Sequence, residues 1–401
     1  MSVYLDHNAT APVHPEVTQA LISVLEDIHG NPSAPYALGV DAKRVLARAR
    51  ENASILLGTR RKEVFFTSGG TEANNLALNG VFFARRDVKR PHLILSSIEH
   101  PSVAATCQWL ADRHGAELTV IDVPSTGVIN PADVVNALRP ETVLVTVMHA
   151  NNETGAIQPV EIIGHFLEGV GVHFHVDGVQ AAGRIPVDVQ AIACDSYSVS
   201  AHKFGGLKGC GALILREGGK VEAILRGGHQ EKGLRAGTEN VPGIAAMGKA
   251  AEIAARDLQK NRTHCLRMRA VFDALAVRLP DCSINGDKTL RLPNTTNLLC
   301  RDADAMSIVM ALSSQSVFVG TGSACASDTQ EPSRVLKAMG LTDRDALCSI
   351  RISTGPENTL LDATSAARKI AEVVERTRLV SDPDSIGGCD ESCACHQEEP
   401  P

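Results

Sequence analysis

The sequence lacks a long apolar run. Its most apolar stretch is residues 142–148, whereas a membrane-spanning helix needs about 20 consecutive apolar residues. The beginning of the sequence, MSVYLDHNATAPVHPEV, also lacks the basic segment and the apolar stretch that make up a signal peptide. We therefore expect a soluble, cytoplasmic protein that does not bind a membrane.

Positive charge is not in excess either. The 401 residues carry a formal net charge of −7, so the charge balance gives no reason to expect direct binding to nucleic acid. The eleven cysteines are an odd number and are scattered through core-like segments, which is not the pattern of a disulfide framework. In a reducing cytoplasm, such thiols are more often buried, catalytic or bound to a metal.

The sequence does contain an alternation of short apolar runs and longer helical stretches. With 44% hydrophobic and 21% charged residues, it is an ordinary globular chain that is long enough for two domains. Seven runs are predicted to be strands, at residues 64–67, 92–97, 117–123, 142–148, 172–177, 197–200 and 211–216. Helical periodicity between these runs predicts an α/β fold, with helices on both faces of a mostly parallel seven-stranded sheet.

The chain changes character after residue 228. A smaller α+β domain is predicted from a long helix, two strands and a last helix, at residues 243–279, 297–300, 349–353 and 363–379. Residues 381–401 are polar and without periodicity, and we expect them to form a flexible tail. The large domain is predicted to comprise residues 15–242, and the small domain residues 1–14 and 243–380.

A glycine-rich motif follows the first predicted strand. Ligands of open α/β sheets bind beyond the carboxyl ends of the strands, and after Thr67 the chain reads SGGTEANN, a glycine turn that opens a helix. The free N–H groups and the positive dipole end of such a helix predict a phosphate cradle around Gly70 and Thr71. The alternative is an ordinary glycine turn in which Thr71 caps the helix. The motif is not a P-loop.

His173, His175 and Asp177 alternate along one predicted strand, so their side chains point to the same face of the sheet. They could form a metal site of two histidines and one carboxylate, as in non-haem iron enzymes. Side chains along one flat strand diverge, however. This favours the alternative that only Asp177 is functional, as a buried carboxylate at the strand end.

Lys203 follows another predicted strand, in the segment SAHKFGG. A lysine in a glycine-rich loop, with a phosphate cradle and Asp177 nearby, is typical of a lysine that forms a Schiff base with a cofactor. From Lys203 alone, a solvated loop lysine would be the simpler interpretation. The combination of the three features favours the catalytic one.

Cys325 lies in a segment of small residues, TGSACAS. Glycine, serine and alanine neighbours cannot bury a thiol well, and they suit a mobile loop that carries an exposed, reactive cysteine. The alternative is a buried structural cysteine, which is the commoner case.

Twelve motifs between about residues 5 and 374 resemble those of the cysteine desulfurases and follow one another in the order of that family. They are LDHNATAPVHPEV, HGNPS, TSGGTEANNLA, EHPSV, NNETG, HVDGVQ, SVSAHKFGG, KGCGAL, QEKGLRAGTEN, GSACAS, EPSRVLKAMG and SIRISTG. The resemblance implies the aspartate-aminotransferase-like fold (fold type I), a homodimer, pyridoxal 5′-phosphate as the cofactor and L-cysteine as the substrate.

The resemblance also implies which residues bind the cofactor. Lys203 would attach the cofactor covalently and later move the Cα proton of the substrate. Asp177 would pair with the pyridinium nitrogen, Gln180 would bond the phenolic oxygen, and His100 would stack on the ring and assist proton transfer. The phosphate would be held by Gly70, Thr71, Ser200 and His202, together with Thr238 of the partner subunit.

For the substrate, the resemblance implies that Arg351 and Asn152 bind the carboxylate, Asn152 also lying beside the cofactor. Cys325 would attack the substrate sulfur, leaving alanine and an enzyme persulfide. A protein acceptor would then take the sulfur for iron–sulfur cluster assembly, tRNA thiolation or DNA phosphorothioation. The alternatives are a selenocysteine lyase or another β-lyase with the same cofactor, a metal-dependent enzyme using the two histidines and Asp177, and a non-catalytic sulfur-relay scaffold. A β-lyase would not need the cysteine of GSACAS.

The chain departs from the family pattern at a few places. Tyr36, Leu207 and Lys232 stand where the family usually has histidine, proline and arginine, and none of them has a predicted catalytic role. The ending has no counterpart in the family pattern. It contains four candidate metal ligands, Cys389, Cys393, Cys395 and His396. These residues could bind zinc or copper(I), or the thiols could accept sulfur in a relay. The alternative is a solvated tail without such a role.

Overall fold

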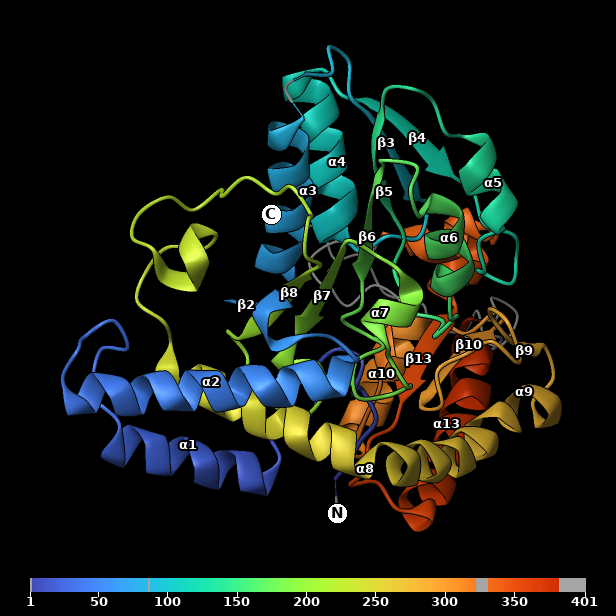
Figure 1. Ribbon diagram of the computed structural model, residues 1–401. Helices are drawn as coiled ribbons and strands as arrows, with labels where there is room; N and C mark the ends of the chain where they lie inside the picture. The colour runs from blue at the N-terminus through green and yellow to red at the C-terminus, as the bar shows by residue number, and fades with distance from the viewer. Residues whose placement is uncertain (1, 86, 322–330, 382–401) are drawn as a thin grey trace, which may run out of the picture.

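The computed structural model of the chain describes residues 2–85, 87–321 and 331–381 (Figure 1). Its largest element is a seven-stranded sheet of order β2-β8-β7-β6-β5-β3-β4. The strands are β2 (Val64–Thr67), β3 (His92–Ser96), β4 (Glu117–Ile121), β5 (Thr142–Thr146), β6 (His173–Asp177), β7 (Ser196–Ser200) and β8 (Gly211–Leu215). Neighbouring strands run parallel except where β8 pairs with β2 and β7. The predicted α/β fold and its seven strands are confirmed.

Helices cover both faces of this sheet, as the apolar runs of its strands require. Leu93 and Leu95 of β3 pack on one face with α3 (Gly70–Ala84) and α4 (Pro101–His114). Ile94, between them, points to the other face and joins the cluster that includes α6 (Val160–Leu167) and α7 (Val189–Ile192). One further short helix, α5 (Pro131–Asn136), contributes Val134 to the same cluster.

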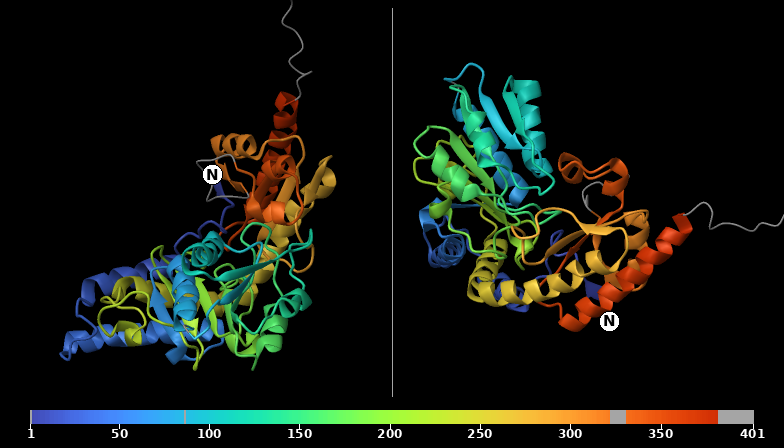
Figure 2. Two further views of the ribbon diagram at one scale, coloured as in Figure 1. Left: turned by 90° about the horizontal axis from the view of Figure 1, so that it is seen from above. Right: turned by 90° about the vertical axis from the view of Figure 1, so that its right-hand side faces the viewer.

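A smaller sheet and the elements around it form a second body (Figure 2). Its sheet has the order β12-β13-β10-β9, and the first strand of the chain pairs in parallel with β11. The strands are β1 (Val3–Tyr4), β9 (Cys282–Ile284), β10 (Thr295–Cys300), β11 (Val317–Phe318), β12 (Gly320–Thr321) and β13 (Ser349–Ser353). Its helices are α9 (Leu275–Arg278), α10 (Ala305–Ser314) and α13 (Leu360–Ser381). Two further short helices, α11 (Arg334–Ala338) and α12 (Asp343–Leu347), contribute Val335, Leu336 and Ala346 to the hydrophobic cluster of the large sheet.

One helix, α8 (Val241–Asp273), belongs to both bodies. Ile244 and Met247 near its start lie in the hydrophobic cluster under the large sheet, whereas Met268 and Phe272 near its end lie in the cluster of the small body. The single helix predicted over residues 243–279 corresponds to two consecutive helices, α8 and the short α9. The domain boundary between residues 242 and 243 stays a prediction.

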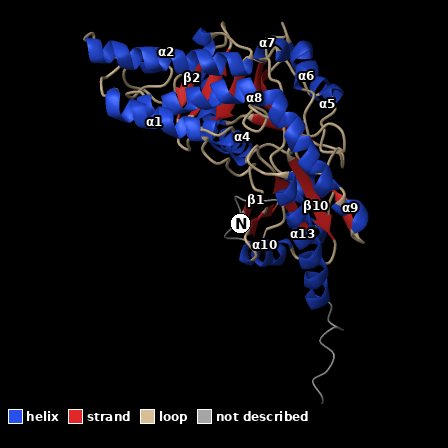
Figure 3. Ribbon diagram, turned by 90° about the horizontal axis from the view of Figure 1, so that it is seen from below, coloured by secondary structure: helices blue, strands red, loops and turns tan. Residues whose placement is uncertain are grey.

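Two helices near the start of the chain were not assigned from the sequence. They are α1 (Pro15–Asp27) and α2 (Ala37–Leu57), and both lie alongside α8 (Figure 3). The buried face of α2 consists largely of alanine and leucine at helical spacing, including Ala42, Leu46, Ala49 and Ala53. A Cβ at Gly248 of α8 would lie 2.4 Å from the Cα of Ala49, so glycine is what allows these helices to approach so closely.

Across the described ranges, no helix is both long and apolar enough to cross a membrane.

Candidate active site

Asp177 is a buried, hydrogen-bonded carboxylate at the carboxyl edge of the large sheet. Its Oδ2 accepts a hydrogen bond from the Asn74 amide at 2.8 Å, and its Oδ1 accepts one from the Val179 N–H at 3.0 Å. The Asn74 Oδ1 in turn contacts His175 Nε2 at 3.0 Å and the Ser198 hydroxyl at 2.5 Å. The side chain of Asp177 is thus fixed in one direction by α3 and by the turn that follows β6.

The metal-site alternative for His173 and His175 is not supported. Both imidazoles contact the hydroxyl of Ser196, His173 through Nε2 and His175 through Nδ1, each at 2.8 Å. Burial lowers the pKa of His173 to about 4 and that of His175 to about 3, so both rings are neutral hydrogen-bonding groups. No group of three or more His, Cys, Asp or Glu side chains within the described ranges could hold a metal ion.

Lys203 lies in a 3₁₀ turn (Ala201–Lys203) directly after β7. Its Nζ donates hydrogen bonds to the backbone carbonyls of Asn8 at 2.6 Å and Ala9 at 2.8 Å. Burial, followed by the positive charges of Arg184 and Arg351, lowers the pKa of Lys203 to about 7. The amine therefore has a substantial neutral fraction near pH 7, which is the nucleophilic form.

Two glycines stand at the start of α3, at the predicted phosphate cradle. A Cβ at Gly70 would lie 2.7 Å from a methyl group of Val179, and a Cβ at Gly69 would lie 3.9 Å from the Ser200 hydroxyl. Glycine at position 70 thus lets the start of the helix approach Val179 and Ser200 closely, and the first N–H groups of a helix have no partner within the helix itself. Thr71, the next residue, is exposed. This arrangement fits a phosphate group.

Three other predicted cofactor residues make contacts within the chain. His100 caps α4, because its Nδ1 accepts a hydrogen bond from the Ser102 N–H at 3.1 Å, and burial lowers its pKa. The Gln180 amide donates to the Asn8 carbonyl at 3.0 Å. His202 Nδ1 contacts the Thr10 hydroxyl at 3.1 Å, and burial lowers its pKa to about 4.

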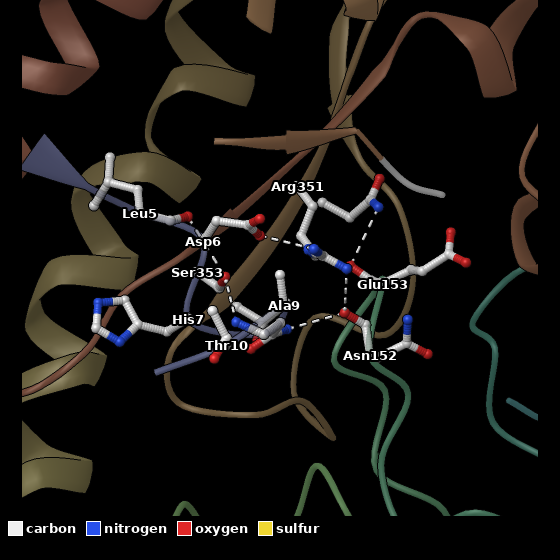
Figure 4. Close-up of polar contacts among 12 residues, drawn as sticks. Leu5, Asp6, His7, Ala9, Thr10, Asn152, Glu153, Arg351 and Ser353 are labelled. Atoms are coloured by element: carbon white, nitrogen blue, oxygen red, sulfur yellow. Dashed lines mark hydrogen bonds and ion pairs between the residues drawn. The ribbon is translucent and has the colours of Figure 1, made fainter. Parts of the chain in front are cut away.

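Arg351 and Asn152 come together where the two bodies meet (Figure 4). Arg351 lies on β13, and its side chain is only 2% exposed. One terminal nitrogen donates to the Asp6 carboxylate at 2.7 Å and the other donates to the Asn152 carbonyl at 3.2 Å. The remaining guanidinium nitrogen, Nε, is buried and has no hydrogen-bond partner among the residues that the structure describes.

Thr238 lies near the end of β2, which precedes the predicted phosphate cradle. It is exposed and lines a cavity of about 230 Å³ with Ser68, Cys210 and Arg235 of the same chain. The predicted role of Thr238 across a dimer interface stays a prediction. The nucleophile candidate Cys325 lies outside the described residues, as do the tail candidates Cys389, Cys393, Cys395 and His396.

The three departures from the family pattern lie outside this constellation. Tyr36 is the N-cap residue of α2 and is 57% exposed. Leu207 packs with Val17 and α8. The Nζ of Lys232 lies 5.0 Å from the centre of the Phe65 ring.

Several site residues had no assigned role in the sequence prediction. Asp6 and Asn8 enter the site from the first residues of the chain, and Asn74 orients Asp177.

Two buried glutamates support the loops that carry His100 and Asn152. Burial raises the pKa of Glu99 to about 8 and that of Glu153 to about 7. Glu99 was visible within EHPSV and Glu153 within NNETG, but sequence does not reveal their hydrogen bonds.

The site and the fold together define a class of enzymes. A lysine past a strand end, a buried carboxylate on the neighbouring strand and a glycine-opened helix N-terminus are the arrangement by which aminotransferase-like proteins hold pyridoxal phosphate. The family model for class-V aminotransferases matches residues 3–364 of the chain.

Individual relatives narrow the class further. The chain is 40% identical over 380 residues to the cysteine desulfurase IscS of Methanosarcina thermophila, covering 95% of this chain and 94% of the relative. A solved NifS-like protein superposes with a TM-score of 0.88 at 33% identity, covering 94% of this chain and all of that one. A structure of SspA in complex with cysteine has a TM-score of 0.78 at 32% identity and covers 89% of this chain and all of that one.

The chain belongs to the cysteine desulfurases, a family of pyridoxal-phosphate-dependent enzymes that remove sulfur from cysteine. The resemblance inferred from the twelve motifs is confirmed, as are fold type I and the enzyme class.

Proposed function

We propose that the chain binds pyridoxal phosphate through Lys203 and uses it to take sulfur from L-cysteine. The observation that carries the proposal is the environment of the lysine amine. Two backbone carbonyls hold it at the end of β7, and burial with two neighbouring arginines lowers its pKa to about 7. A neutral amine in a fixed position is what attack on an aldehyde requires.

The residues around Lys203 fit the rest of this cofactor. The phosphate would lie at the start of α3, between its N–H groups and the Ser200 hydroxyl. Asp177, fixed by Asn74 and the Val179 N–H, would keep a proton on the ring nitrogen. When bound, pyridoxal phosphate supplies an electron sink for negative charge at the substrate Cα. Lys203 would take the Cα proton, since its amine is linked to the proposed substrate residues. It donates to the Asn8 carbonyl, and both the Asn8 amide and the Arg351 guanidinium donate to the Asn152 carbonyl.

Arg351 and Asn152 would bind the carboxylate of the substrate. The buried Nε of Arg351 has no partner among the described residues, and a carboxylate oxygen would satisfy it with a charge-assisted hydrogen bond. L-Cysteine as the substrate is supported by the family and by the 32% identical SspA, whose structure was solved in complex with cysteine.

Cys325 would receive the sulfur. Its thiolate would attack the substrate sulfur, so that an S–S bond forms, the Cβ–S bond breaks and Cβ takes up a proton. The products are alanine and an enzyme persulfide. A cytoplasmic protein acceptor would then take the sulfur for iron–sulfur cluster assembly, tRNA thiolation or DNA phosphorothioation. The active form would be a homodimer.

The test uses the full chain reconstituted with pyridoxal phosphate and mixed with L-cysteine. Alanine is measured together with the mass of tryptic peptide 302–334, whose single cysteine is Cys325. We expect one persulfide on this peptide for each alanine of the first turnover. Lys203→Ala should abolish both products. Lys208→Ala serves as the matched control, because Lys208 is an exposed lysine of the same loop.

Two outcomes would contradict parts of the proposal. Alanine without a persulfide on peptide 302–334 would remove Cys325 from the mechanism. The second outcome concerns Cys325→Ser. If this variant released selenium from L-selenocysteine at the wild-type rate but no sulfur from L-cysteine, the selenocysteine lyase alternative would be favoured, because a lyase does not need this cysteine.

A further inference from the structure

Two cysteines face each other across the sheet of the small body. Cys282 on β9 and Cys300 on β10 are directly opposite in the antiparallel pairing. The Cys300 N–H donates to the backbone carbonyl of Cys348, on the other side of β10, at 2.8 Å. The N–H of the next residue, Arg301, donates to the backbone carbonyl of Asp281 at 3.1 Å. Cys282 and Cys300 therefore occupy a non-hydrogen-bonded position of the β9–β10 ladder.

This position brings the two thiols close together. At non-hydrogen-bonded positions of antiparallel strands, the Cα atoms are about 4.5 Å apart and the side chains lie on the same face. A disulfide needs a Cα separation of about 4.4–6.8 Å. The strand pairing thus already has the spacing that a Cys282–Cys300 disulfide requires.

The two thiols differ in exposure and in charge environment. Cys282 is half-buried, and the Arg378 guanidinium donates a hydrogen bond to its sulfur at 3.4 Å. Cys300 is fully buried. The hydrogen bond with the Cys300 thiol, assisted by Arg378 and opposed by burial and Asp281, lowers the pKa of Cys282 to about 7. The same hydrogen bond and burial raise the pKa of Cys300. Cys282 is thus the thiolate of the pair, and Cys300 is the thiol.

We propose that Cys282 and Cys300 form a redox-active pair that hydroperoxides oxidise reversibly to a cross-strand disulfide. The Cys282 thiolate attacks one peroxide oxygen, so that an S–O bond forms, the O–O bond breaks and the other oxygen leaves, with a proton, as water or an alcohol. The Cys300 sulfur then attacks the Cys282 sulfenic acid, an S–S bond forms and water leaves with the Cys300 proton. Two electrons pass from the two thiols to the hydroperoxide, and a thiol reductant reverses the change.

This inference does not depend on the sulfur chemistry of the active site, and trypsin separates the cysteines concerned. Cys282 falls in peptide 279–288, Cys300 in peptide 292–301 and Cys348 in peptide 345–351, each as the only cysteine. The full-length protein is treated with hydrogen peroxide, its remaining thiols are alkylated, and the digest is analysed by mass spectrometry. We expect peptides 279–288 and 292–301 to appear joined, two hydrogens lighter than their sum, and to separate on reduction.

Single variants test which thiol attacks. In Cys300→Ser, Cys282 should accumulate a sulfenic acid that a dimedone probe captures. In Cys282→Ser, Cys300 should remain reduced. Arg378→Gln should slow oxidation of Cys282 by up to about tenfold, the change in thiolate population that one pKa unit gives. The peptide with Cys348, the residue between α12 and β13, reports in every sample whether a neighbouring thiol is oxidised nonspecifically.

Three results would overturn the inference. One is a wild-type digest in which Cys282 is oxidised while Cys300 stays alkylated. Another is a link from either cysteine to Cys348 in place of the Cys282–Cys300 link. The third is oxidation of Cys300 in Cys282→Ser at the wild-type rate, which would show that Cys282 is not the attacking thiol.

Discussion

The carboxylate of Asp6 and the guanidinium of Arg351 form a salt bridge of 2.7 Å between residues from opposite ends of the sequence. Asp6 follows the first strand, and Arg351 lies on β13. An isolated β-bridge between Asp6 and Ser353 holds the two segments together. The salt bridge therefore fixes a buried guanidinium whose Nε is the proposed donor to the substrate carboxylate.

Replacement of Asp6 should weaken substrate binding without loss of the cofactor. In Asp6→Ala the guanidinium loses its charged partner and its fixed direction, and the KM for L-cysteine should rise at least about tenfold, since hydrogen bonds to charged groups contribute about 1.5–3 kcal/mol. Asp6→Asn, which keeps an acceptor oxygen, should show a smaller rise. The measurements are KM, kcat and cofactor content. Equal KM values in wild type and Asp6→Ala would show that Asp6 does not orient Arg351.

The buried amine of Lys203 should make the stability of the cofactor-free protein depend on pH. Its pKa is 10.5 in the unfolded chain and about 7 in the folded one. Between these values the unfolded chain binds a proton that the folded chain lacks, so the free energy of unfolding rises with pH through this interval. Below pH 7 both states are protonated, and the full cost of the buried charge remains.

The comparison with Lys203→Met isolates this effect. The variant should be stabilised relative to wild type most strongly below pH 7. Its advantage should shrink steadily towards pH 10, leaving only a constant offset from the lost hydrogen bonds to Asn8 and Ala9. Urea unfolding of the apoprotein at several pH values measures it. Lys208→Met is the control, because Lys208 is an exposed lysine of the same loop. A pH-independent difference for Lys203→Met would mean that the folded pKa is close to 10.5.

Sequence alone predicted the parts of this structure that depend on local patterns. The seven strands of the large sheet are continuous apolar runs, and Lys203 and Asp177 stand at strand ends, where ligands of α/β sheets bind. Sequence could not predict contacts that only the tertiary fold creates. Asn74 resembles any polar residue of a helix, yet it holds Asp177. Asp6 and Asn8 reach Arg351 and Lys203 only because the start of the chain crosses both bodies.

The contact between Ser333 and Glu153 should stabilise the fold by more than a helix cap alone. The Ser333 hydroxyl donates to the Glu153 carboxyl at 2.5 Å, and its oxygen also caps α11 by accepting the Leu336 N–H at 3.1 Å. Ser333→Ala removes both interactions and should lower the free energy of unfolding by about 2–3 kcal/mol, as the sum of a lost cap and a lost buried hydrogen bond.

Thr342→Ala is the matched control for the cap. Thr342 caps the next helix, α12, by accepting the Asp345 N–H at 3.1 Å. Its loss should cost only about 1 kcal/mol. If thermal or urea unfolding gave the same loss for Ser333→Ala and Thr342→Ala, the buried Glu153 would gain nothing from Ser333.

Thr238 should complete the cofactor site of the partner subunit. It is exposed in its own chain and lies in the loop after Gly237. In a twofold-symmetric dimer, each site would then combine Lys203 of one subunit with Thr238 of the other.

Thr238→Ala alone should retain pyridoxal phosphate poorly, and Lys203→Ala alone should be inactive. A mixed dimer of the two variants places both substitutions in one site and leaves the other site intact. After unfolding and refolding an equal mixture, roughly a quarter of all sites should regain full cofactor retention and turnover, because half of the dimers are mixed and each has one intact site. Cofactor content and alanine formation are compared with those of the two variants refolded separately. Activity that stays at the average of the separate variants, in a sample that native mass spectrometry identifies as containing mixed dimers, would place Thr238 and Lys203 in the same subunit's site or remove Thr238 from the site altogether.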